Sequence, residues 1–230
     1  MISVGILDTK GLGHNPSLEF LLPKGERERL KKINKGKARS LSFFSRLLLM
    51  KLYREKTGKN MPEISYTEEG KPYFLDNVCS FSVSHDKDFV VVALSDEGNI
   101  GVDVQSFCGS EETLKRIEKR FLKDITFNEE TIENFDIDVE YFVIDLKKDC
   151  VNFKKEREED IVCKSENVEN KDFLIRWTKL EALLKLVGCG FKELKNVNKY
   201  LQKVNFKTWF FQHGGQYTAL NLAFYENINF

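Results

Sequence analysis

Two residues suited to acid–base or metal chemistry stand about one helical turn apart in RWTKLEALLK, residues 176–185. Glu181 precedes Lys185 by four positions, and Trp177 precedes Glu181 by the same interval. At 3.6 residues per turn, the three side chains form a row along the margin of the leucine stripe. The row is either a solvated ion pair that stabilises the helix by about 0.2–0.5 kcal/mol, or a carboxylate and an ammonium placed to meet another element.

A second carboxylate stands in GVDVQ, residues 101–105. Side chains alternate along a strand, so Asp103 and Gln105 share one face while the two valines occupy the other. Aspartate is depleted in strands, so its presence at this position needs an explanation. The polar face lies either in water on an edge strand, or close to Glu181, where two carboxylates offer the oxygen ligands that Mg²⁺ prefers.

A histidine follows the predicted strand in SFSVSHD, residues 80–86. Alternation places Phe81 and Val83 on one side of this strand and Ser82 and Ser84 on the other. His85 opens the turn that follows. It is either a donor to a phosphate group or an ordinary turn residue at the surface, and the segment alone leaves both interpretations open.

Periodicity predicts the elements that must position these groups. The region 24–58 is helical, with Leu41, Phe44, Leu48 and Leu52 as one apolar stripe. Residues 89–105 predict a hairpin that turns at 96–99. Further predicted elements are a first strand at 3–8, a helix at 111–122, a strand at 138–146, a helix ending at the glycines of 188–190, and two strands around 213–215. The charge runs KKEREED and KSENVENKD within 123–172 are interpreted as solvated turns or a mobile loop.

Composition narrows the class of protein. The 230 residues are 41% hydrophobic and 31% charged, as in a folded domain. Lys plus Arg equals Asp plus Glu at 36 each, which argues against nucleic acid or an anionic membrane as the main partner. Five scattered cysteines without a Cys-x-x-Cys pair predict reduced thiols, and the sequence predicts neither a signal segment nor a membrane span. We therefore expect a cytoplasmic protein.

The motifs GKP (70–72), SFSVSHD, GVDVQ, KRF (119–121) and WTKLEALLK (177–185) resemble, in order and spacing, those of the 4'-phosphopantetheinyl transferases. The similarity is to the larger, pseudodimeric type, the surfactin-synthetase-activating type, and covers residues 35–190 best. It implies an α+β fold of two similar halves in a pseudo-twofold arrangement, each a small antiparallel sheet with a long packed helix. The halves would be residues 1–105 and 106–230, with the ligand between them.

The resemblance also implies a reaction: transfer of the 4'-phosphopantetheine arm of coenzyme A to a serine of an apo acyl or peptidyl carrier protein, releasing 3',5'-ADP. Such enzymes serve fatty acid or secondary metabolite biosynthesis, and this type acts as a monomer. The implied catalytic residues are Asp103, Glu181 and Lys185. Glu181 would take the serine proton, and Lys185 would stabilise the departing phosphate. Mg²⁺ would be bound by Asp103, Glu181 and the amide oxygen of Gln105. Coenzyme A would be bound by Arg39, Lys71, Ser84 and His85.

Two positions depart from the family pattern. Gln105 replaces an expected acidic residue and brings no negative charge to the metal. Leu180 replaces the lysine expected directly before Glu181, with Lys179 one place earlier. Residues 123–172 also form a longer segment than is usual for the family. An alternative is therefore a degenerate member that binds coenzyme A or a carrier without catalysis, and a further one is an unrelated α+β protein.

Overall fold

The computed structural model describes residues 1–106, 110–127, 136–147, 150–156, 170–213 and 216–225. Its strands are β1 (Ile2–Asp8), β2 (Ile64–Tyr66), β3 (Pro72–Phe74), β4 (Ser80–Asp86), β5 (Phe89–Ser95), β6 (Ile100–Ser106), β7 (Ile137–Leu146), β8 (Val151–Glu156), β9 (Val204–His213) and β10 (Gln216–Tyr225). Its helices are η1 (Pro16–Leu21), α1 (Lys24–Lys31), α2 (Lys37–Thr57), α3 (Glu111–Ile117), η2 (Glu118–Leu122), α4 (Lys171–Val187), η4 (Gly190–Asn196) and α5 (Val197–Leu201). The α+β class is confirmed.

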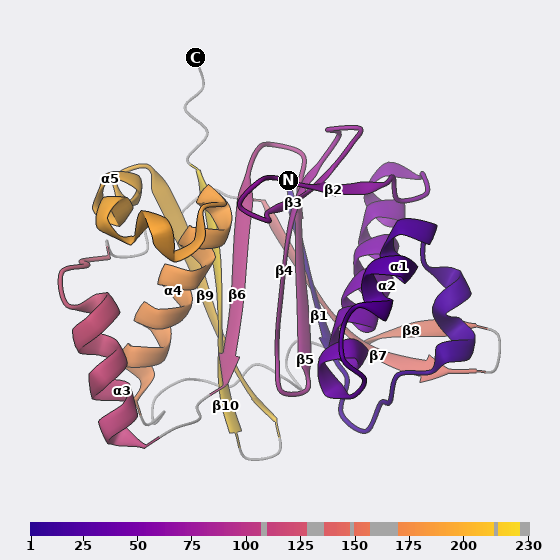
Figure 1. Cartoon of the computed structure of the whole chain (residues 1–230), viewed down its shortest axis with the longest axis horizontal. Coiled ribbons are helices and arrows are strands. Elements are labelled where there is room, and N and C mark those ends of the chain that lie inside the picture. Colours follow the sequence, from indigo (N-terminus) through magenta and orange to yellow (C-terminus); the bar gives the residue numbers. More distant parts are fainter. Residues whose placement is uncertain (107–109, 128–135, 148–149, 157–169, 214–215, 226–230) are drawn as a thin grey trace.

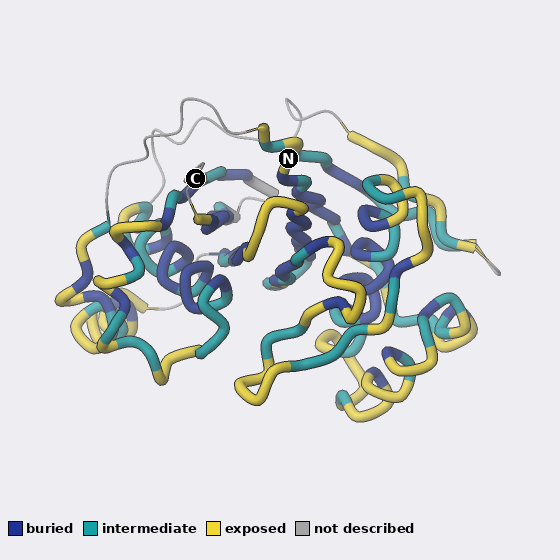
Figure 2. Tube along the Cα trace, turned by 90° about the horizontal axis from the view of Figure 1, so that it is seen from above, coloured by how far each residue is buried: buried dark blue, intermediate teal, exposed yellow. Residues whose placement is uncertain are grey.

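The strands form three sheets, ordered β4-β5-β1-β7-β8, β6-β10-β9 and β2-β3. In Figure 1, α1 and α2 lie on one side of the strands, and α3, α4 and α5 lie on the other. Figure 2 shows the buried residues gathered in the strands and in the helix faces turned toward them, with exposed residues on the outer loops. The molecule is thus layered from α2 through the two larger sheets to α4.

Helix α2 covers one face of the five-stranded sheet. Its predicted stripe of Leu41, Phe44, Leu48 and Leu52 is buried, as expected for an amphipathic helix. The helical region predicted for 24–58 divides into α1 and α2 at Gly36, which has a φ of 116°. L side chains avoid this conformation, so the glycine permits the break between the two helices.

The second face of that sheet packs on the three-stranded sheet. Val4 of β1 and Val91 of β5 share a core with Val102 and Val104 of β6 and with residues of β10. Because strand side chains alternate, the opposite face of β6 carries Gly101, Asp103 and Gln105 toward α4. The helix α4 buries its leucines against this face and ends at Gly188, as the sequence predicts.

The hairpin predicted for residues 89–105 is wrong. Strand β5 forms its hairpin with β4, whereas β6 pairs antiparallel with β10 in the other sheet. Side chains of β4 reach the backbone of β6 instead of a strand partner. The bonds run from Val102 N to Ser82 Oγ (3.0 Å), from Val104 N to Ser84 Oγ (3.2 Å), and from Ser106 N to Asp86 Oδ2 (2.6 Å). These acceptors satisfy amide groups on the edge of β6 that faces away from β10. We call this set of three contacts the β4–β6 seam.

The larger sheets are not both antiparallel, contrary to the expected small antiparallel sheet in each half. Strand β1 pairs parallel with β7, although the tail strands β9 and β10 form the predicted antiparallel pair. The strand predicted at 138–146 is confirmed as β7, and β8 includes the start of the run KKEREED. The rest of that run and most of KSENVENKD lie outside the described residues. Because β7 and β8 join the sheet of β1, the sheets do not follow a division of the chain at residue 105.

The structure also bears on the expected reduced thiols and on the expected lack of a membrane span. Cys79, Cys150 and Cys189 are free thiols, while Cys108 and Cys163 lie outside the described residues. Within the described part of the chain, no helix combines the length and the apolar character that crossing a membrane requires.

Candidate functional site

A glycine brings α4 close to the strand that carries Asp103. A methyl group added to Gly101 would lie 2.0 Å from the carbonyl oxygen of Ala182 and 2.5 Å from the backbone nitrogen of Leu186. Only a residue without a side chain fits between the strand and the helix backbone at this point. The helix thereby lies against β6 at the level of Glu181 and Lys185, which confirms that GVDVQ and WTKLEALLK meet.

Lys185, Asp103 and Ser84 form a closed hydrogen-bonded triangle. Lys185 Nζ donates to Asp103 Oδ1 at 2.8 Å and to Ser84 Oγ at 2.9 Å, and Ser84 Oγ donates to Asp103 Oδ1 at 2.8 Å. Asp103 is 6% exposed, so the ammonium compensates for a carboxylate that is otherwise removed from water. Lys185 is therefore a partner of Asp103, and the isolated i,i+4 pair with Glu181 is not its main contact.

Glu181 is half-buried and shares an electrostatic environment with Asp103. Burial raises the pKa of Glu181 above its ordinary value, the charge of Asp103 raises it further, and Lys185 opposes both effects. Two carboxylates that repel one another at short range are a site where a divalent cation is favoured.

The two carboxylates at this point are oxygen donors of the kind that Mg²⁺ accepts. No group of three or more His, Cys, Asp and Glu side chains is gathered closely enough to hold a metal among the residues that the structure describes. Mg²⁺ is commonly bound by one or two carboxylates, with waters and substrate phosphates completing its shell. Gln105 lies half-buried on the same face of β6, and its Nε2 donates to Ser106 O at 3.2 Å. Its predicted role as a ligand stays a prediction.

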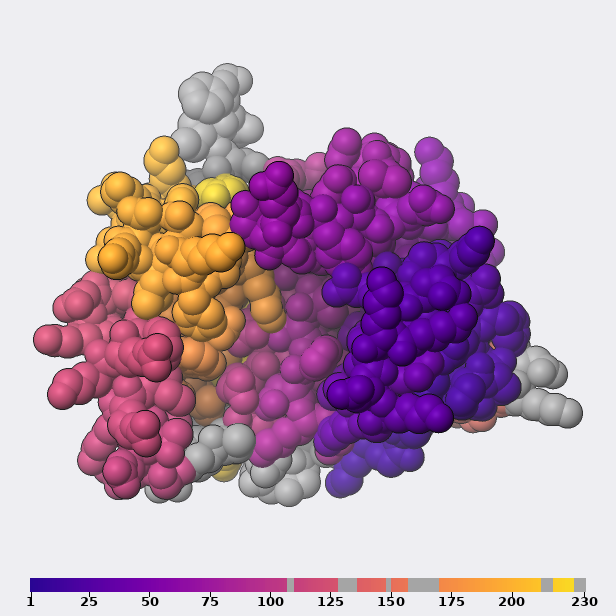
Figure 3. All heavy atoms as spheres, in the orientation of Figure 1, coloured from indigo at the N-terminus to yellow at the C-terminus, as the bar shows by residue number. Residues whose placement is uncertain are grey.

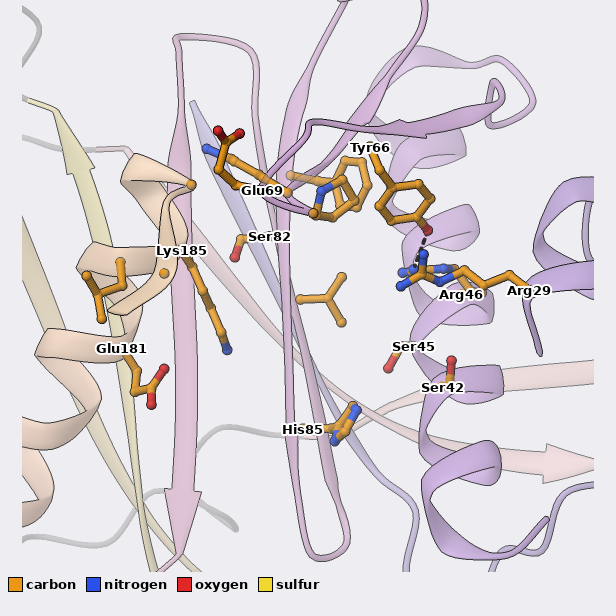
Figure 4. A pocket seen from close by; sticks show the side chains of 18 of the residues that line it. Arg29, Ser42, Ser45, Arg46, Tyr66, Glu69, Ser82, His85, Glu181 and Lys185 are labelled. Carbon is orange, nitrogen blue, oxygen red and sulfur yellow. Dashed lines mark hydrogen bonds between the residues drawn. The ribbon is translucent and has the colours of Figure 1, made fainter. Parts of the chain in front are cut away.

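Glu181 and Lys185 line a cavity of about 470 Å³. The opposite wall comes from the N-terminal helices, with Arg29 of α1 and Ser42, Ser45 and Arg46 of α2. In Figure 4 Glu181 and Lys185 extend from α4 toward this wall, and His85 of β4 lies between α4 and the wall. Figure 3 shows the same relation on the surface, where residues of β4 and β6 lie between the N-terminal helices and the α4 region. The volume and shape fit a small-molecule ligand.

Two of the predicted coenzyme A contacts line this cavity with lowered pKa values. The surrounding protein atoms lower the pKa of His85, although its side chain reaches solvent, and the charge of Lys185 lowers it further. Burial lowers the pKa of Lys71 to about 8. The Lys71 ammonium donates to Leu186 O at 2.6 Å, one of the last carbonyls of α4. Lys71 therefore ties the loop before β3 to the end of the helix that carries Lys185.

The structure adds two arginines that the sequence interpretation missed. Arg46 forms an ion pair with Glu26 at 2.5 Å and donates to Tyr66 Oη at 3.3 Å. Arg29 lies 4.0 Å above the ring of Tyr66, in cation–π geometry. A signal was present in the sequence, since Ala38, Ser42, Ser45 and Arg46 recur on one helical face and place small and polar residues beside the apolar stripe.

Two of the predicted coenzyme A contacts lie elsewhere. Arg39 lines a separate cavity, where its Nη2 pairs with Glu19 Oε1 at 2.8 Å and His14 Nε2 lies 2.9 Å from the same oxygen. Ser84 is buried, and its contacts are Lys185, Asp103 and the β4–β6 seam. The structure therefore brings together His85, Lys71, Glu181, Lys185 and Asp103, but places Arg39 apart and Ser84 behind the cavity wall.

Comparison with known proteins adds an independent observation. A family model described as "4'-phosphopantetheinyl transferase, N-terminal" matches residues 17–97. The 4'-phosphopantetheinyl transferase AcpT of Escherichia coli K12 is 44% identical over 46 residues, which are 20% of this chain and 24% of that protein. AcpT of Escherichia coli O157:H7 matches with the same values. The chain thus aligns with about a quarter of the length of these curated relatives. The matches thus show similarity to 4'-phosphopantetheinyl transferases in part of this chain.

Proposed function

We propose that this protein transfers the 4'-phosphopantetheine arm of coenzyme A to a serine of an apo acyl or peptidyl carrier protein and releases 3',5'-ADP. The observation that carries the proposal is that Glu181 and Lys185 line one wall of a cavity whose other wall carries Arg29 and Arg46, with the buried Asp103 bonded to Lys185 behind that wall. Such a site combines a carboxylate base with positive groups, which phosphoryl transfer from a pyrophosphate needs. The matches to the transferase family point to the same reaction.

Binding of coenzyme A would use two positive side chains and one imidazole of the cavity. Arg29, Lys71 and His85 line it from α1, the loop before β3 and the end of β4. A guanidinium binds a phosphate through two parallel hydrogen bonds, and an ammonium acts as a point charge. Held from three sides, the pyrophosphate would present its reactive phosphorus toward α4.

Asp103 and Glu181 would hold Mg²⁺, with the amide oxygen of Gln105 as a third contact. Bound there, the ion would neutralise charge on the pyrophosphate oxygens during transfer. Lys185, which stabilises the Asp103 carboxylate in the structure, lies within reach of the same region.

Proton transfer would be the task of Glu181. Its raised pKa makes the carboxylate a stronger base than an ordinary glutamate, and its side chain opens into the cavity. It would accept the proton of the carrier serine as the hydroxyl oxygen attacks the phosphorus of the phosphopantetheine arm. Lys185 would then stabilise, or donate a proton to, the phosphate oxygen that leaves with ADP.

The finer features of the proposal follow the larger, pseudodimeric type of the family. It would comprise two halves related by a pseudo-twofold, at residues 1–105 and 106–230. The enzyme would act as a monomer in the cytoplasm on carriers of fatty acid or secondary metabolite synthesis. Its cavity is lined from both sides of residue 105, which supports a ligand bound between the halves.

The decisive experiment incubates the protein with coenzyme A, Mg²⁺ and several apo carrier proteins and follows the carrier mass. Gain of the phosphopantetheine arm is expected with the wild-type protein, and its loss is expected in Glu181→Gln and in Asp103→Ala. Glu69→Gln is the matched control, because Glu69 lines the same cavity from the loop before β3. Coenzyme A binding without transfer to any carrier would favour a degenerate binding protein. Absence of both would favour a protein unrelated to the family.

A further inference from the structure

A chain of hydrogen-bonded polar groups, two of them fully buried, runs from β9 through β10 to α4 behind the proposed catalytic residues. Thr208 Oγ1 donates to Asn221 Oδ1 at 2.6 Å, and Asn221 Nδ2 donates to Thr178 Oγ1 at 2.5 Å. Thr178 and Asn221 are each 0% exposed. A buried amide or hydroxyl is retained at a cost unless it is hydrogen-bonded, so each link in this chain matters.

The direction of each bond in the chain is determined by its neighbours. Thr178 Oγ1 donates its proton to the carbonyl of Leu174, at 2.6 Å within α4. It can therefore act only as an acceptor toward Asn221, which fixes the amide nitrogen of Asn221 on the helix side. The amide oxygen then faces Thr208 on β9, and this polar chain is satisfied from strand to helix.

This chain of polar groups also lies next to the proposed catalytic residues. Asn221 of β10 is paired across the strands with Asp103 of β6 on one side and with Thr208 of β9 on the other. Thr178 precedes Glu181 by three residues, less than one helical turn along α4. The strand position beside Asp103 is thus bonded to the helix position beside Glu181.

Apart from the bond of Lys185 to Asp103, which is the contact to be positioned, most of the remaining contact between α4 and the sheet is apolar. Leu180, Leu183 and Ala182 are buried there, and hydrophobic burial by itself has no direction. The close approach at Gly101 limits the distance between helix and strand but does not by itself prevent rotation of the helix. A hydrogen bond at Thr178 depends on direction, so it adds a second point of attachment that favours one rotation of α4 about its axis.

We infer that Thr178 and Asn221 are positioning residues that hold α4 in the register where Glu181 and Lys185 meet Asp103. This inference rests on the proposed transferase function. Removal of the bond would leave most of the coenzyme A binding in place, because two of its proposed contacts, Arg29 on α1 and His85 on β4, are not on α4. It would displace the groups that act on the carrier serine and the leaving phosphate.

The test compares Thr178→Val with Thr178→Ser and with Thr218→Val. Thr218 pairs with Ser106 through a buried hydroxyl contact of 2.9 Å on the opposite face of the same sheet, away from α4. Thr178→Val and Thr218→Val should each lower Tm by about 2–4 °C. Only Thr178→Val should also lower kcat, by roughly 10- to 100-fold, with KM for coenzyme A unchanged within twofold. Thr178→Ser, which keeps the hydroxyl, should restore most of kcat.

A second measurement does not depend on transfer. Calorimetric titration of Mg²⁺ in the presence of coenzyme A should show several-fold weaker binding in Thr178→Val and wild-type binding in Thr218→Val. If Thr178→Val does not fold, Thr208→Val removes the outer hydrogen bond of the polar chain. It should also lower kcat without changing KM for coenzyme A, with a smaller loss of kcat. Equal kcat in Thr178→Val, Thr218→Val and the wild type would overturn the inference. A wild-type protein that neither transfers nor binds Mg²⁺ would instead overturn the proposed function.

Discussion

Replacing Gly101 by alanine should separate α4 from β6 and disable the site without touching any residue that contacts substrate. The added methyl carbon would lie 2.0 Å from the carbonyl oxygen of Ala182, whereas an ordinary contact starts at 3.4 Å. The obstacle is helix backbone, which cannot rotate aside as a side chain can. Helix and strand must therefore part by about 1.4 Å along this direction.

A displacement of this size should cost activity more than stability. Overpacking of this kind destabilises a protein by about 1–3 kcal/mol, which is tolerable for many domains of this size. A misplacement of about 1 Å in a catalytic group can lower the rate by roughly 100-fold. We expect Gly101→Ala to fold and to transfer the phosphopantetheine arm about 100-fold more slowly than the wild type. The assay is the rate of carrier mass gain, with Tm measured on the same preparation.

Gly5→Ala is the matched control, because its added methyl would lie 2.9 Å from Leu52 Cδ1, on the other side of the molecule. That neighbour is the end of a flexible side chain against α2, so the change tests overpacking of a strand against a helix away from α4. It should lower Tm modestly and leave the transfer rate near that of the wild type. A Gly101→Ala protein with wild-type turnover would show that the close approach of α4 does not set the geometry of the site.

Further substitutions test the charges of the cavity. Lys71 titrates with a pKa of about 8, below its ordinary 10.5. Its proton is therefore lost from the folded protein first, so coenzyme A affinity should fall as the pH rises through 8, while the stability penalty for burying the charge is relieved between pH 8 and 10.5. Titration calorimetry at pH 7 and 9 checks this, and Lys71→Gln should remove the pH dependence of affinity. Arg29→Gln should raise KM for coenzyme A by about tenfold, and Arg39→Gln, in a separate cavity, should leave it unchanged. Equal effects of the two substitutions on KM would show that the proposed position of the phosphates is wrong. Lys185→Met should lower kcat by at least about 100-fold, and steady-state kinetics with preserved coenzyme A binding would distinguish this from unfolding.

Much of the fold was predictable where one local pattern decided the structure. The stripe of α2, the leucines of α4 and the terminal glycine Gly188 follow from periodicity and backbone preference alone. The partners of β5 and β6 were not predictable in the same way. Both segments carry strand patterns around a good turn sequence, but the partner of β6 is β10, more than a hundred residues later, and local propensity carries no information on that choice.

The residues of the candidate site were likewise predictable only in part. Asp103 and Glu181 attracted attention because a carboxylate in a strand and one at the margin of a buried helix face are both unusual positions. Their meeting could be proposed from the resemblance, but the reason for it, the missing side chain of Gly101, is a matter of tertiary contact. Arg39 shows the opposite case, since a basic residue near the right motif lies beside Glu19 in another cavity.

The parallel pairing of β1 with β7 has a consequence for how the chain folds. Strand β1 must wait for its partner β7, which begins at Ile137, and β6, which carries Asp103, must wait for β10, which begins at Gln216. Contacts of such wide sequence separation slow folding, because the entropy of closing the loop is lost before the contact forms. During synthesis, an N-terminal segment released from the ribosome would therefore expose the unpaired edge of β1 until β7 follows. The proposed catalytic strand β6 would gain β10 as its neighbour only after more than a hundred further residues have been made.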